Sequence, residues 1–283
     1  MRRLAAVGAA IGLLALLALL LGACGGGGGN PATVTALRDA PKTTTDAKTG
    51  RMEVVIERHG EGPPQAPITV AGEADFQAHR GHMLIDLSQL GLPGPPVDAV
   101  FDNATVYEKF PQALGAALPP GKSWVKVDLA TAGKSVGVGA GGIGQAQAGD
   151  PSQTLDYLRG VSDHVTRVGT EDVRGTQTTH YRAVADLEKA AERSPTAREQ
   201  IKASIKLLGS STQPLDVWID AQGRVRRMKY AVDLSKSKAA ASTPRVSGLA
   251  TFTLDLFDFG VPVQATVPPA DQVTDLSALT GGK

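Results

Sequence analysis

The stretch Leu215–Leu234, LDVWIDAQGRVRRMKYAVDL, decides how the chain folds. Two runs in which apolar and polar residues alternate flank a short turn, Ala221–Arg224, which contains a glycine. Alternation with a period of two predicts half-buried strands, and a short glycine-containing connection predicts that they pair as an antiparallel hairpin. The chain is therefore expected to build antiparallel strands with one apolar face.

The same alternating pattern recurs on both sides of this hairpin. Asp102-Asn103 supplies turn chemistry between two further apolar runs, and Pro- and Gly-rich segments separate the others. Strands are expected at Met52–Ile56, Ile68–Phe76, Met83–Leu87, on both sides of the turn within 99–110, at Trp124–Leu129, 162–169 and 176–185, and at Val246–Phe259. The sequence thus predicts an α+β fold with an antiparallel sheet of about nine to eleven strands and helices on one face.

Few segments have helical spacing. Thr33–Ala40 places Val34, Leu37 and Ala40 on one side, and Pro41 interrupts it or begins a second turn. Cap-and-proline starts and apolar spacing predict three further helices: one from Asp150-Pro151 that carries Leu155 and Leu158, one at Asp186–Arg193, and one from Ser194-Pro195 that carries Ile201, Ile205 and Leu208.

The N-terminus has the pattern of an export signal. Arg2 and Arg3 precede the apolar run Leu4–Leu21, which is also just long enough for a membrane anchor. Leu21-Gly22-Ala23-Cys24 resembles the bacterial lipobox, whose cysteine receives a diacylglycerol and becomes the first residue after cleavage; the alternative is a small buried cysteine in a signal anchor. We therefore expect a signal peptide at 1–23, a lipidated Cys24 with a glycine-rich tether at 24–32, a folded domain at 33–268 and a flexible tail at 269–283.

Composition excludes several functions. The chain has 29 basic and 28 acidic residues without a dense basic segment, which argues against a nucleic-acid partner. Cys24 is the only cysteine, so neither an internal disulfide nor a cysteine-based metal site can form.

Three motif matches are weak. Gly133–Gly137 fits the G-x-S-x-G elbow of serine hydrolases around Ser135, with His164 and His180 later in the chain, but the glycine-rich residues that follow are poor helix formers. The glycine pattern at 137–144 fits a dinucleotide fingerprint without its βαβ frame. His79 and His82 would point to opposite faces of a strand. We expect no enzyme activity, cofactor or metal.

The layout as a whole resembles the LppX/LprG-type lipoproteins of actinobacteria. The segments that carry the resemblance, besides the lipobox, are Asp150–Leu158, Val173–Ala183, Val217–Arg226, Phe257–Val263 and Pro268–Val273. The resemblance implies a half-barrel like that of the LolA and LolB carriers: a curved antiparallel sheet, helices that cover its concave face, and an apolar cavity between them for acyl chains. It supplies no catalytic residues.

Strand parity and helical spacing identify the residues expected to face this cavity. Taken alone, each of them fits an ordinary core position better than a cavity lining, and it is as a set that they mark the cavity. The expected lining is Met52, Val54, Ile56, Met83, Ile85, Leu87, Leu155, Leu158, Ile201, Ile205, Met228, Tyr230, Val232, Phe252, Leu254 and Leu256.

The leading hypothesis is a lipoprotein anchored through Cys24 on the extracytoplasmic face of the cell membrane. It would bind or carry a lipid or lipoglycan, with an envelope transporter as a further partner. The alternative is a non-carrier interaction or sensing module whose core is filled, and a third is an exported hydrolase that uses Ser135. A pocket of a few hundred cubic ångströms would distinguish the first from the second.

Overall fold

The computed structural model describes residues 30–59, 66–86, 88, 94–109, 118–128, 151–233, 235 and 248–279. Several predicted features lie outside these residues. They are the signal peptide, Cys24 and its glycines, Leu87, Ser135 and the rest of the glycine-rich stretch 133–149.

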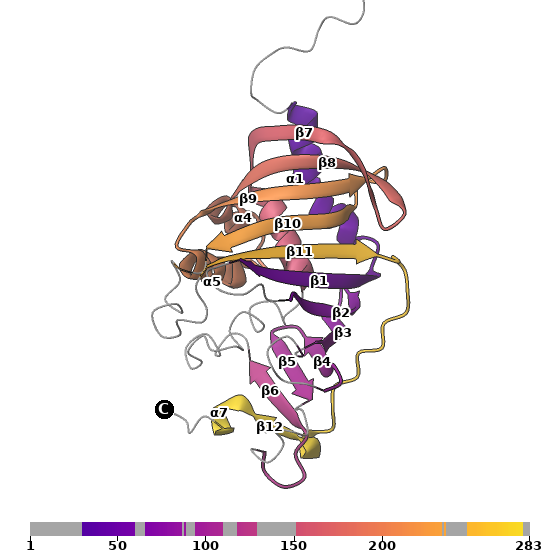
Figure 1. Cartoon of the computed structure of the whole chain (residues 1–283), viewed down its shortest axis with the longest axis vertical. Helices are drawn as coiled ribbons and strands as arrows, with labels where there is room; N and C mark the ends of the chain where they lie inside the picture. The colour runs from indigo at the N-terminus through magenta and orange to yellow at the C-terminus, as the bar shows by residue number, and fades with distance from the viewer. Residues whose placement is uncertain are drawn as a thin grey trace, which may run out of the picture.

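One curved, unclosed sheet forms the body of the molecule (Figure 1). Its strands follow the order β12-β6-β5-β4-β3-β2-β1-β11-β10-β9-β8-β7, and all neighbours are antiparallel except β12 and β6. The strands are β1 Thr49–His59, β2 Ile68–Asp75, β3 Arg80–Ile85, β4 Val97–Asp102, β5 Thr105–Lys109, β6 Trp124–Asp128, β7 Val161–Val173, β8 Thr176–Asp186, β9 Thr212–Asp220, β10 Val225–Asp233, β11 Leu249–Phe257 and β12 Val273–Asp275.

The principal helices lie on one side of this sheet, which we call the concave face; the opposite side is the convex face (Figure 1). Their apolar residues and the inner residues of the strands form a single buried cluster. The helices are α1 Pro31–Thr45, η3 Pro151–Gly160, α4 Leu187–Arg193 and α5 Arg198–Leu208, with the short η6 Ala270–Gln272 and α7 Leu276–Leu279 beside β12. Among the described residues, none of the helices has both the length and the apolarity needed to cross a membrane.

Helix α1 is longer than predicted in both directions. The side chain of Asn30 accepts a hydrogen bond from the backbone N–H of Ala32, and Pro31 suits the first turn, so the helix begins inside the range expected to be tether. It continues past Pro41 to Thr45, and both Pro41 and Thr44 are buried. Burial of this face offsets the one hydrogen bond that the proline removes.

The predicted start of the last long helix is wrong by a few residues. Ser194 does not cap it; the carbonyl of Ser194 instead accepts a hydrogen bond from Ala197 N–H, in a turn that links α4 to α5. Helix α5 therefore begins at Arg198 and ends at Leu208, and the next residue, Gly209, has a φ of 64°, the left-handed conformation that suits glycine.

The prediction of a flexible tail at 269–283 is wrong for its described part. Residues 270–279 form η6, β12 and α7, and β12 pairs with β6 in parallel, Val273 opposite Trp124. The backbone N–H of Ser123 also donates to the carbonyl of Gln272 at 2.9 Å. This strand raises the count to 12, above the predicted nine to eleven, and a strand of three residues is too short for alternation to reveal.

Candidate functional site

Rows of apolar side chains cross the concave face from strand to strand. Phe252 on β11 lies opposite Ile56 on β1 and Tyr230 on β10, and Leu254 lies opposite Val54 and Met228 in the same way. Residues directly opposite each other on antiparallel strands point to the same face. The register therefore brings together the residues predicted on these three strands: Met52, Val54, Ile56, Met228, Tyr230, Val232, Phe252, Leu254 and Leu256.

The other predicted lining residues join the same cluster. Met83 and Ile85 enter it from β3, and Leu155, Leu158 and Ile201 enter from η3 and α5. Ile205 is only partly buried and packs against its edge. That the set lines a ligand cavity stays a prediction.

An aromatic stack that the sequence did not reveal connects η3 to the sheet. Tyr157 meets the edge of Tyr230 at 6.0 Å between ring centroids, and Tyr230 stacks on Phe252 at 5.2 Å. The Tyr157 hydroxyl is 2.9 Å from Ser204 Oγ on α5, and burial raises the pKa of this tyrosine. Tyr157 thus presents an apolar ring to the concave face and satisfies its polar end between helices.

The concave face extends further along the sheet than predicted. The half formed by β2–β6 contributes a second set of buried apolar residues. The alternation of apolar and polar residues within each of these strands already indicated which residues face inward. They are Val70, Ala74, Val97, Ala99, Phe101, Val106, Val125 and Val127. In this half of the sheet the backbones of β2 and β3 approach closely at Gly72. A Cβ built on Gly72 would lie 2.0 Å from the carbonyl oxygen of His82.

The convex face carries a network of charged groups that sequence reasoning missed. His180 on β8 places Nδ1 2.8 Å from Glu171 and Nε2 2.7 Å from Asp216, so each ring nitrogen faces a carboxylate. The ring stacks on Trp218, whose Nε1–H donates to Glu171 at 2.8 Å. The hydrogen bonds from Trp218 and His180 lower the pKa of Glu171.

The network continues across β10, β11 and β1. Arg227 donates to both carboxylate oxygens of Asp255, at 2.6 and 2.7 Å. Arg174, at the tip of the β7–β8 hairpin, donates to Asp255 at 2.8 Å and also bonds Glu53, while its guanidinium lies over the ring of Phe257. Arg174 thus links the hairpin tip to β11 and β1, two strands that are distant from it in the sequence.

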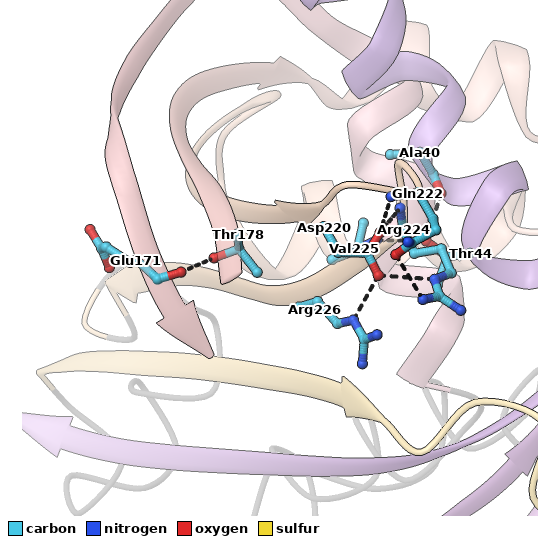
Figure 2. A network of polar contacts seen from close by, with 9 residues as sticks. All are labelled: Ala40, Thr44, Glu171, Thr178, Asp220, Gln222, Arg224, Val225 and Arg226. Carbon is cyan, nitrogen blue, oxygen red and sulfur yellow. Dashed lines mark hydrogen bonds and ion pairs between the residues drawn. The ribbon is translucent and has the colours of Figure 1, made fainter. Parts of the chain in front are cut away.

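A second polar cluster joins the β9–β10 turn to helix α1 (Figure 2). Asp220 accepts hydrogen bonds from the backbone of the turn and from the side chains of Arg224 and Arg226, at 2.9 and 2.8 Å. Burial opposes the ionisation of Asp220, but these donors outweigh it and lower its pKa. Thr44 accepts from Val225 N–H at 2.9 Å and donates to a backbone carbonyl one turn earlier in α1.

The weak motifs gain no support from the described residues. His180, one of the two histidines considered with Ser135, is held between two carboxylates. His82 pairs with Asp98 at 3.2 Å, and His79 lies in the turn before β3. Across the described part of the chain, no group of three or more His, Cys, Asp and Glu side chains is placed to hold a metal ion.

Two curated proteins of Streptomyces are similar in sequence, while no family model matches the chain. An uncharacterized 31.2 kDa protein from the rplA–rplJ intergenic region of Streptomyces griseus is 28% identical over 262 residues, which are 87% of this chain and 80% of that protein. A protein of Streptomyces coelicolor named a "Putative lipoprotein" is 28% identical over 179 residues, 62% of this chain and 48% of that protein.

Among solved structures, the Mycobacterium tuberculosis lipoprotein LppX is similar with a TM-score of 0.50 and 13% identity. The match covers 84% of this chain and 100% of the LppX chain. At this identity the likeness concerns the fold, and it confirms in that respect the resemblance drawn from the sequence. The chain therefore has the fold of the actinobacterial lipoprotein LppX.

Proposed function

We propose that the chain is an envelope lipoprotein, anchored through Cys24, that holds acyl chains against its concave face. The observation that carries this proposal is the set of apolar rows that runs from β10 across β11 and β1 to β6 inside an unclosed sheet. An acyl chain that left water to lie along such rows would gain about 0.8 kcal/mol for each buried CH₂ group.

The comparisons support the same class of protein. LppX is a lipoprotein by its description, and the Streptomyces coelicolor relative is named as one. A carrier anchored to a membrane by acyl chains on Cys24 would remain within reach of the lipids it binds. Binding alone accounts for this role, so no catalytic group is required.

The test is mass spectrometry of lipids that co-purify with the chain from an actinobacterial host. We expect stoichiometric, non-covalent lipid in an organic extract of the purified protein, beyond the diacylglycerol attached to Cys24. Val54 on the concave face and Val55 on the opposite face of β1 offer a matched pair. Val54→Phe should lower the amount of bound lipid and Val55→Phe should leave it unchanged, with equal circular dichroism spectra.

Two results would point elsewhere. A protein that carries no lipid and accepts none from vesicles of phosphatidylglycerol would favour an interaction or sensing module with a filled core. Equal loss of lipid in both variants would show that lipid binds elsewhere than on the concave face.

A further inference from the structure

A single carboxylic acid interrupts one of the apolar rows of the concave face. Glu108 on β5 lies opposite Ala99 on β4 and Val125 on β6, which are 0% and 2% exposed. Because opposite residues share a face, the Glu108 side chain belongs to the same row as these two. On the other side of Ala99 the row continues through Met83, Gly72 and Met52.

The row is the one that contains expected cavity residues. Met52 and Met83 are both buried and both belong to the predicted lining. Glu108 is partly buried, and it is the only charged group in the row from Met52 to Val125. A ligand that lay along this row would bring the Glu108 carboxyl group into contact with it.

Nothing in the described structure compensates this carboxyl group. No hydrogen bond or ion pair within the described residues reaches its side chain, and burial alone raises its pKa. The adjacent cation, Lys109, is on the opposite face, where it lies 3.9 Å from Asp98 and over the ring of Trp124. A carboxyl group in an apolar row without a partner costs stability, and such costs are typical of binding sites.

The ligand group that suits this position is uncharged. Burial favours the protonated acid, which can both accept a hydrogen bond from a hydroxyl and donate one to it. An ammonium group would have to leave water together with an ionised carboxylate, so a neutral hydroxyl group carries the smaller desolvation cost. A ligand that combines acyl chains for the apolar rows with a hydroxyl group for Glu108 is an acylated polyol with a free hydroxyl group.

We propose that Glu108 hydrogen-bonds a free hydroxyl group of an acylglycerol that lies along the concave face. This inference rests on the proposed lipid-binding function and specifies the class of lipid. Glu108 acts as a positioning contact for the polar end, and the apolar rows contact the acyl chains.

The test compares two neutral lipids that differ in this hydroxyl group. The full chain is offered 1,2-dioleoylglycerol, which has one hydroxyl, and trioleoylglycerol, which has none, and the bound amounts are measured after equal detergent exchange. We expect wild-type protein to prefer dioleoylglycerol by roughly three- to tenfold, the range of one net hydrogen bond. Glu108→Leu should abolish the preference, and Glu108→Gln, which keeps hydrogen-bonding capacity, should retain most of it.

A control and a second readout keep the test decisive. Glu57→Leu changes a glutamate on the opposite face of β1 and should leave the preference unchanged. Glu108→Leu should also raise the urea midpoint of the lipid-free protein, because it removes an uncompensated acid. If wild type binds both lipids equally, or Glu108→Leu keeps the preference, this inference fails alone; if wild type binds neither, the proposed function fails with it.

Discussion

Asp255 offers the sharpest test of how the convex face stabilises the sheet. The carboxylate is 5% exposed and accepts three hydrogen bonds, two from Arg227 and one from Arg174. Asp255→Asn preserves the shape of the side chain but removes its charge and turns an N–H₂ group toward the two guanidinium groups. Breaking a buried pair on one side costs 3–5 kcal/mol, and the arginine side chains, 32% and 34% exposed, can be partly rehydrated. We expect a loss of about 3 kcal/mol in the free energy of unfolding.

Asp258, three residues along, provides the matched control. It pairs with Arg51 at 3.3 Å, and the two side chains are 52% and 56% exposed, so Asp258→Asn should cost less than about 1 kcal/mol. Urea unfolding followed by circular dichroism at pH 7 measures both changes. Equal losses in the two variants would refute the argument that burial gives the Asp255 pairs their strength.

The contacts of Asp255 with Arg227 and Arg174 also predict how the free energy of unfolding depends on pH. Burial opposes the ionisation of Asp255, but the hydrogen bonds from Arg227 and Arg174 outweigh it and hold its pKa below the ordinary 3.8. A lowered pKa in the folded state stabilises the protein fully above the unfolded value, and this contribution disappears as the pH falls through the folded value. The difference between wild type and Asp255→Asn should therefore be constant near neutrality and shrink below about pH 4.

Three further predictions concern other parts of the chain. Thr44→Val leaves the buried N–H of Val225 without an acceptor and should lower the free energy of unfolding by about 1–3 kcal/mol; an unchanged urea midpoint would contradict the role given to this contact. Gly72→Ala should cost at least ~2 kcal/mol because its Cβ would overlap the backbone of β3, whereas Gly169→Ala meets open space and should be nearly neutral in the same assay. Cys24→Ser should move the protein out of the detergent-rich phase on Triton X-114 partition, and retention there would argue for a signal anchor.

Local sequence patterns predicted much of the fold because the strands and the turn of a hairpin are adjacent in the sequence. Asp102 and Asn103 stand at the turn between β4 and β5, where Asn103 has a φ of 54°, the left-handed conformation that asparagine tolerates. The hairpin from Leu215 also appears as predicted, as β9 and β10. Once such strands are identified, alternation assigns each residue to a face, which explains why the described lining residues meet in one cluster.

The remaining features depend on contacts between distant segments. Arg174 and Asp255 are 81 residues apart, and a polar residue on the outer face of a strand has the same pattern whether it meets water or another side chain. The last residues of β7, Thr170–Val173, are mostly polar and show no alternation. The sequence therefore did not predict that β7 extends as far as the hairpin tip that carries Arg174. Glu108 belongs to the same class, because its apolar surroundings come from β4 and β6.

The two faces of the sheet contribute to stability in different ways, the convex face through polar contacts and the concave face through apolar packing. On the convex face, Glu171, His180, Trp218, Arg227 and Asp255 follow one another over five adjacent strands, and each contacts the next or its neighbour. These contacts connect strands β7 to β11 on the outside of the curve, where no packing against a helix is needed. In this part of the sheet, these contacts stabilise strand pairing independently of the packing on the concave face. Room for a ligand on the concave face is thus compatible with a stable fold, and the loss of lipid in Val54→Phe without loss of structure is the result that this division predicts.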